Sequence, residues 1–67
     1  MVDPKIIGDR LKALRGKRKV EHVAKALGIS RSALSMYESG HRVPRDEIKV
    51  KIAHFYNTSI ETIFFAS

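Results

Sequence analysis

The sequence predicts an all-α fold, a compact domain of five short helices that spans residues 1–67. Apolar residues recur at helical spacing along the whole chain, and no segment alternates apolar and polar residues for long enough to form a strand. The 67 residues, of which 43% are hydrophobic, suit one small domain with a packed core. The chain has no cysteine, so packing rather than disulfides must hold this fold together.

The first two helices are predicted from their apolar stripes and from residues that mark helix ends. Pro4 can occupy the first turn of a helix, and the stripe that follows it ends at Gly16. The second helix covers about residues 20–27, and Gly28 is placed to end it with a positive φ. The expected buried positions are Ile7, Leu11 and Leu14 in the first helix and Val23, Ala24 and Leu27 in the second.

The later helices follow from the same signals. Ser30 can cap a third helix that runs to about Ser39, and Gly40 then begins a basic loop. Asp46 can cap a fourth helix, and Ser59 can cap a short fifth helix. The expected inward residues are Leu34 and Tyr37 in the third helix, Ile48, Ile52 and Ala53 in the fourth, and Ile60, Ile63 and Phe64 in the fifth.

The segment from Val20 to Ser39 predicts a helix-turn-helix motif. Two short helices cross closely in this motif, so the first needs a small residue at the crossing and the turn needs a glycine. Ala24 and Gly28 meet both requirements at the required spacing. Apolar residues occupy the inward positions around the turn, and the agreement of several independent positions makes the prediction specific.

On these residues the chain resembles the lambda-repressor-like, Cro/CI-type (Xre) helix-turn-helix family of bacterial and phage regulators. The matching segments are GDRLKALR at 8–15, VAKALGIS at 23–30, SALSMYESG at 32–40 and RVPRDEIKVKIAHFYNTSIETIFF at 42–65. The resemblance implies a recognition helix at about 31–39 that enters the major groove, and a homodimer on a pseudo-palindromic operator. It also implies a partly buried ion pair between Arg15 and Glu38 that orients the recognition helix.

Base reading is expected from outward positions near the start of the recognition helix. These positions are Arg31, Ser32, Ser35 and Met36, and the usual base readers of the family correspond to Arg31, Ser32 and Met36. Arg31 is the main expected source of specificity, because a guanidinium can donate two hydrogen bonds to O6 and N7 of guanine.

The charge of the chain favours a polyanionic partner. Thirteen Lys and Arg oppose seven Asp and Glu, which gives a net charge of +6. The start of the second helix also offers free backbone amides to a phosphate. The expected phosphate ligands are Lys17, Arg18, Lys19, Ser30, Ser39, His41, Arg42 and Arg45.

The last two helices carry more apolar residues than their inward stripes require. Such a surplus is typical of an interface between copies of a chain, as the resemblance also implies. The expected dimer interface consists of Val50, Phe55, Ile60, Phe64 and Phe65.

No enzymatic, metal or cofactor chemistry is expected. The three histidines lack metal-ligand spacing, and the chain has neither a Gly-x-Ser-x-Gly elbow nor a glycine-rich phosphate loop. No apolar run is long enough to span a membrane, so the expected location is the cytoplasm, in association with the nucleoid.

The function expected is sequence-specific binding of a double-stranded DNA operator by a transcriptional repressor, with a protein regulator as a further partner. The alternative is a protein-interaction module, such as an antitoxin or anti-repressor with the same fold. Two departures from the family favour it: Lys19 replaces the usual capping Ser or Thr, and Val20 replaces a polar residue. A third possibility is nonspecific architectural binding of DNA.

Overall fold

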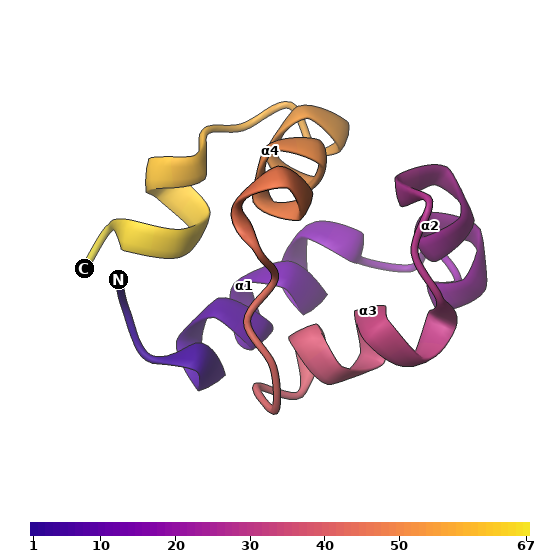
Figure 1. The fold of residues 1–67 in the computed structure, drawn as a ribbon, viewed down its shortest axis with the longest axis horizontal. Coiled ribbons are helices and arrows are strands. Elements are labelled where there is room, and N and C mark those ends of the chain that lie inside the picture. The colour runs from indigo at the N-terminus through magenta and orange to yellow at the C-terminus, as the bar shows by residue number, and fades with distance from the viewer.

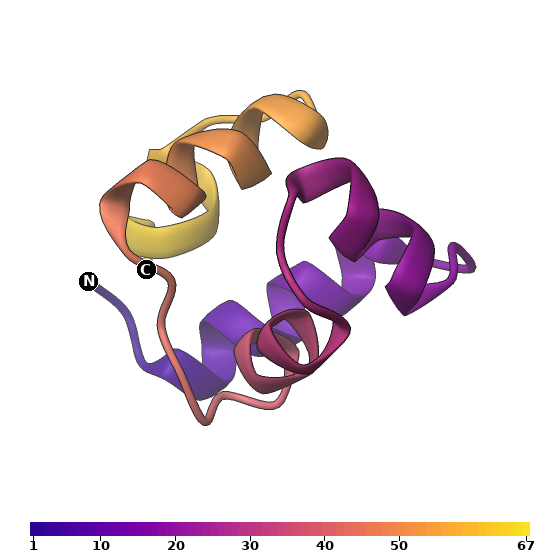
Figure 2. The same ribbon diagram turned by 45° about the vertical axis from the view of Figure 1, so that its right-hand side comes forward.

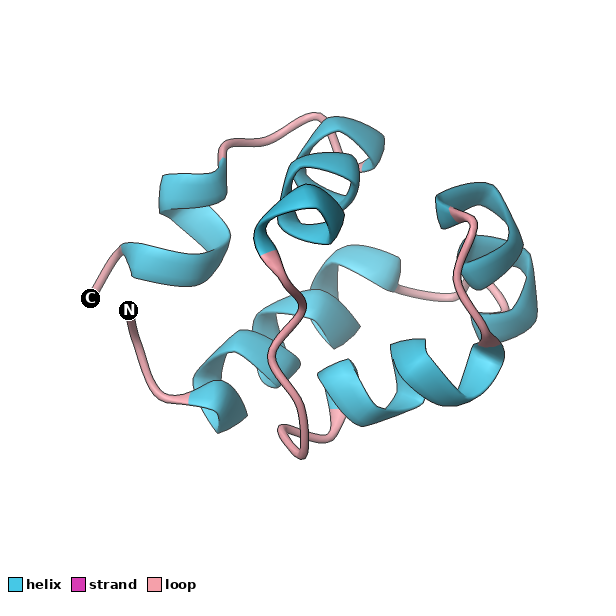
Figure 3. Ribbon diagram, in the orientation of Figure 1, coloured by secondary structure: helices cyan, strands magenta, loops and turns pink.

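The computed structural model describes all of residues 1–67 and contains helices and loops but no strand (Figure 3). The elements are α1 (Pro4–Arg15), α2 (Val20–Leu27), α3 (Arg31–Glu38), α4 (Asp46–Phe55) and a short π-helix, η1 (Glu61–Phe65). The predicted all-α fold is confirmed, the first three helices begin and end within a residue or two of their predicted bounds, and the fourth begins within one residue of its predicted start. None of the helices has both the length and the hydropathy that crossing a membrane would require.

The helices surround a single core (Figure 1). α1 packs against α3 on one side and against η1 on the other, while α2 packs against both α3 and α4. In both views, α3 and α4 lie on opposite sides of the domain, with α2 beside them (Figures 1 and 2). The first residues of the chain lie beside the last, and the Val2 N–H donates a hydrogen bond of 3.2 Å to the Phe64 carbonyl.

The core draws residues from all five helices, as the apolar stripes predicted. Its fully buried side chains are Ile7, Leu11, Val23, Leu34, Ile52, Ile63 and Phe64. Each aliphatic or aromatic side chain of this kind contributes about 1.5–3 kcal/mol on burial. Leu14, Ile48 and Ile60, which were also predicted to face inward, are half-buried at the margin of the core.

Gly8 sets the distance between α1 and α3. It is buried on the face of α1 that meets the end of α3. A Cβ at this position would lie 2.4 Å from the Glu38 carbonyl oxygen and 2.9 Å from the Tyr37 carbonyl oxygen. Only glycine therefore allows the two backbones to approach as closely as they do.

The helix ends around Gly28 and Ser30 follow the local signals, whereas the start of α4 does not. Gly28 has a φ of 71° after α2, and the Ser30 hydroxyl accepts a 3.0 Å hydrogen bond from the Ala33 N–H at the start of α3. The prediction that Asp46 caps α4 is wrong. The helix already includes Asp46, and Arg45 occupies the N-cap position without a side-chain hydrogen bond. Asp46 instead adds a negative charge to the first turn, where the helix dipole favours it.

The last element is a π-helix rather than an ordinary α-helical turn. The N-cap position is Ile60 rather than the predicted Ser59, but the Ser59 hydroxyl accepts a 3.0 Å hydrogen bond from the Thr62 N–H just inside the helix. Arg10 of α1 donates to the carbonyl oxygens of Thr62 at 3.1 Å and Ile63 at 3.0 Å, and also to Ala66. Arg10 therefore satisfies carbonyl groups at the end of a helix that is too short to pair them itself.

Candidate nucleic-acid interface

Helix α3 has one face anchored in the core and one face exposed. Leu34, Tyr37 and Glu38 are buried. The four predicted base readers, Arg31, Ser32, Ser35 and Met36, are all exposed. The start of the helix is held by the Ser30 cap, so the backbone that carries these side chains is fixed at the end nearest to Arg31.

The far end of α3 is held to α1 by a bidentate ion pair. Arg15 donates from Nε to Glu38 Oε2 at 2.8 Å and from Nη2 to Glu38 Oε1 at 3.0 Å. The Glu38 side chain is only 5% exposed and that of Arg15 is 20% exposed. The hydrogen bond to Glu38 raises the pKa of Arg15 above its ordinary value, so Arg15 keeps its charge. The predicted pair is present, and its parallel geometry orients α3 against α1.

A carboxylate lies beside the expected specificity residue. Glu21, in the first turn of α2, has Oε2 at 4.0 Å from Arg31 Nε, and both side chains are exposed. The pKa of Glu21 is lowered, chiefly by its own backbone N–H and then by Arg31 and Lys19. This contact was not predicted. Because both side chains are exposed, the contact contributes little to stability, but it places a carboxylate beside the residue expected to read bases.

Several of the expected phosphate ligands lie together. Ser30, Arg42 and Arg45 line one hollow of about 430 Å³ between the start of α3 and the loop that leads to α4. Arg42 makes no ion pair, and Arg45 is 3.7 Å from Glu47 across an exposed contact. The loop therefore brings two arginines to the hollow that Ser30 also lines.

Two further expected ligands, Ser39 and His41, contact each other after α3 ends. Ser39 Oγ lies 2.7 Å from His41 Nδ1, and the same hydroxyl donates to the Met36 carbonyl at 3.2 Å. Both side chains are exposed. Their hydrogen bond places the His41 ring at the C-terminal end of the recognition helix.

The three basic side chains of residues 17–19 do not all lie at the start of α2. Lys17 and Lys19 are exposed and flank the start of α2. The Arg18 guanidinium instead lies 5.5 Å from the ring centroids of both Phe55 and Tyr56, at the end of α4. Cation–π attraction therefore holds Arg18 against α4, a contact that sequence reasoning missed.

The start of α2 carries the two departures from the family pattern, Lys19 and Val20. Lys19 is the N-cap residue and forms no side-chain capping hydrogen bond, and Val20 is half-buried. The N-cap side chain therefore leaves the first amides of α2 unpaired, although the Glu21 carboxylate lies near its own backbone N–H. Glu21 adds a negative charge to the same turn.

The expected dimer residues differ widely in exposure. Val50 is 54% exposed and Phe65 is 43% exposed, whereas Phe55 and Ile60 are half-buried. The assignment of Phe64 to a dimer interface is wrong. Its side chain is completely buried in the core of the single chain, so it has no surface left for a second copy.

Two other residues near these elements were not singled out from the sequence. The Tyr56 hydroxyl is buried without a hydrogen-bond partner, and burial raises the pKa of this phenol. Lys49 of α4 is almost buried, with Nζ 3.4 Å from Asp46 Oδ1 and 5.7 Å from the ring centroids of Phe64 and Phe65. Neither had a sequence signal, because each depends on which side chains tertiary packing places around it.

The fold and the exposed face of α3 define a helix-turn-helix domain of the DNA-binding class. A model of the helix-turn-helix family matches residues 11–63, which is most of the chain. The chain therefore belongs to the helix-turn-helix family of Cro/CI type, whose members are DNA-binding regulators rather than enzymes. No curated protein and no solved structure matches the chain.

Proposed function

We propose that this protein is a sequence-specific transcriptional repressor that binds a double-stranded operator as a homodimer in the cytoplasm, with α3 in the major groove. The observation that carries the proposal is the division of α3 into two faces. Glu38 and the buried apolar residues hold the helix, while Arg31 and its exposed neighbours are left free. A recognition helix needs this arrangement, because its outward N-terminal residues must reach base edges.

Specificity is assigned mainly to Arg31, with Ser32, Ser35 and Met36 completing the base-reading surface. A guanidinium on guanine contributes roughly 1–3 kcal/mol of discrimination, whereas a serine hydroxyl accepts several bases. Arg31 is exposed at the N-terminal end of α3, and its 4.0 Å contact with Glu21 lies in solvent, so the guanidinium can exchange that carboxylate for a base edge.

Contacts to the phosphates of the DNA are assigned to residues on either side of α3. Ser30, Arg42 and Arg45 share one hollow at its start, and Ser39 and His41 lie at its end. Lys17, Lys19 and the uncapped amides of α2 complete the set. Arg18 contributes through its charge at longer range, because its guanidinium rests on α4.

A homodimer is supported by the apolar side chains that the single chain leaves uncovered. Val50 and Phe65 are large, apolar and exposed, and half-buried Ile60 extends the apolar surface, whereas Phe55 lies on the side of α4 that faces α2 and is left out of the proposed interface. Sedimentation of wild type and of Phe65→Ser at matched concentrations measures this part of the proposal. A wild-type chain that stays monomeric both free and on its operator refutes the dimer.

The deciding experiment is selection of duplexes that bind the whole chain from a random library. The expected result is an enriched palindrome, whose symmetry and half-site spacing then report the dimer. Arg31→Ala should lose discrimination between the selected site and random DNA, whereas Lys12→Ala, an exposed cation of α1, should retain it. Unchanged discrimination by Arg31→Ala refutes the role of Arg31.

Two further outcomes separate the alternatives. Binding that depends on salt but enriches no sequence indicates architectural DNA binding. Recovery of no duplex, together with a stoichiometric protein partner, indicates an antitoxin-like or anti-repressor module, which the uncapped start of α2 at Val20 supports. A reporter gene placed behind the selected site then tests repression directly, because the repressor should lower its expression.

A further inference from the structure

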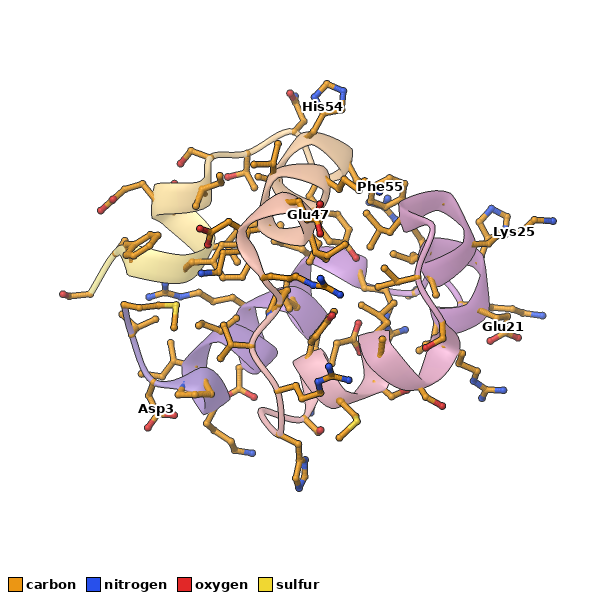
Figure 4. The ribbon with its side chains drawn as sticks, viewed as in Figure 1. Asp3, Glu21, Lys25, Glu47, His54 and Phe55 are labelled. Atoms are coloured by element: carbon orange, nitrogen blue, oxygen red, sulfur yellow. The ribbon has the colours of Figure 1, made fainter.

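A second surface lies between the C-terminal ends of α2 and α4. A groove of about 390 Å³ runs between them, and its lining includes Lys25, Ala26, Leu27, Lys51, His54 and Phe55. Figure 4 shows Phe55 on the side of α4 that faces α2, with Lys25 on α2 and His54 at the end of α4. We refer to this surface as the α2–α4 groove.

The α2–α4 groove has an apolar base and a basic rim. Leu27 is buried, Phe55 is half-buried and Ala26 presents only a methyl group. Lys25, Lys51 and His54 are exposed around them, and no carboxylate lines the groove. Neither lysine takes part in any ion pair of the structure. Arg18 adds a third positive charge to those of the two lysines, since its guanidinium lies over the Phe55 ring.

This pattern specifies the chemistry of an occupant. Unpaired cations attract carboxylates, and an apolar floor gains free energy when an apolar side chain displaces water from it. A nucleic-acid backbone satisfies only the first requirement. We propose that the α2–α4 groove binds an acidic peptide segment of a partner protein, with one leucine or phenylalanine on the floor and carboxylates at Lys25 and Lys51.

The position of the groove is compatible with simultaneous DNA binding. α4 lies on the opposite side of the domain from α3, and the expected base readers are on α3 (Figures 1 and 2). A peptide on the α2–α4 groove therefore leaves the exposed face of α3 open. The inference does not depend on DNA recognition, because the groove is complete in the single chain.

The test is an NMR titration of the ¹⁵N-labelled whole chain with a synthetic twelve-residue peptide that places one leucine among aspartates and glutamates. The expected result is saturable shifts confined to amides of residues 25–28 and 51–55. Replacing the peptide leucine with serine should weaken binding about tenfold or more, because the apolar contact is lost.

Protein variants separate charge from shape. Lys25→Glu/Lys51→Glu should weaken peptide binding about tenfold or more, because two attractions become repulsions. Lys5→Glu/Lys12→Glu makes the same change of charge at exposed positions of α1 and should alter affinity less than about twofold. Ala26→Gln fills the groove without a change of charge and should also weaken binding. Each variant is first shown to keep the wild-type spectrum.

Three results overturn the proposal. The first is equal affinity for the peptides with leucine and with serine, which reduces the effect to general attraction of polyanions. The second is equal loss in the two charge-reversal variants. The third is a random 20-base-pair duplex that shifts the groove amides instead of those of α3, which identifies the groove as a DNA surface. A chain that binds the peptide but no DNA refutes the proposed function and leaves this inference standing.

Discussion

Gly8→Ala is expected to destabilise the domain, although alanine is the better helix former. Placing a methyl group at Gly8 puts a carbon 2.4 Å from the Glu38 carbonyl oxygen, where ordinary contact begins at 3.4 Å. The obstacle is backbone, which no side-chain rotation relieves. α1 and α3 must therefore separate by roughly 1 Å at their crossing, a displacement that also strains the Arg15–Glu38 ion pair.

The expected loss in the free energy of unfolding follows from two opposing contributions. Overpacking of a close contact costs about 1–3 kcal/mol, and a rigid backbone obstacle belongs at the upper end of that range. The change from glycine to alanine inside a helix contributes about 1 kcal/mol in the other direction. The net loss is about 2 kcal/mol, which lowers the melting temperature of a domain of this size by about 8–16 °C.

Urea and thermal unfolding followed by circular dichroism measure this loss. Ala13→Gly in the same helix is the matched control, because Ala13 is exposed. Its replacement measures only the intrinsic preference of the helix for alanine over glycine, about 1 kcal/mol. A Gly8→Ala protein that is as stable as wild type, or more stable, refutes the reasoning. DNA binding by the variant then reports whether the spacing of α1 and α3 orients the recognition helix.

Three other predictions concern buried polar groups. Tyr56→Phe should leave the free energy of unfolding unchanged or raise it by about 1 kcal/mol, since the hydroxyl has no partner. Burial raises the pKa of Tyr56 above its ordinary 10.0, so below pH 10 this residue gives the stability no pH dependence, and the free energy of unfolding falls as the pH rises from 10 through the pKa of the folded state. Ultraviolet titration should show a late phenolate component that Tyr56→Phe removes; an unchanged curve contradicts this. Glu38→Gln should cost about 2–3 kcal/mol, because Arg15 loses its charged partner. The double variant Arg15→Met/Glu38→Leu should cost less, and a larger loss in urea unfolding argues against the desolvation reasoning. Arg10→Ala should speed hydrogen exchange of the last amides far more than that of α2, and uniform acceleration rules out a local clamp.

Most of the fold was predictable because its signals are local. The αL glycine at Gly28 and the cap at Ser30 each act within one turn of their own position, so the sequence around them suffices to place the helix-turn-helix. Asp46 shows the limit of this reasoning. An aspartate is favourable both as a cap and in the first turn, so its presence locates a helix start only to within one residue.

The contacts that hold the candidate site were less predictable, because they join distant parts of the chain. Arg10 pairs with carbonyls near residue 63 and Arg18 with the rings at 55 and 56, and an arginine carries no local sign of its partner. Gly8 did carry a local sign of its contact, since a lone glycine inside a helical pattern commonly marks a close approach of two backbones. Phe64 was ambiguous, since the same apolar residue serves a core or an interface until the tertiary packing is known.

The proximity of the two chain ends has a consequence for the topology of this molecule. The hydrogen bond from the Val2 N–H to the Phe64 carbonyl means that a few linking residues would close the backbone into a ring. Closure removes conformational freedom from the unfolded chain while leaving the folded helices in place. New ends opened in the exposed turn around Asn57, on the side of the domain away from α3, would give a circular permutant with the recognition helix uninterrupted.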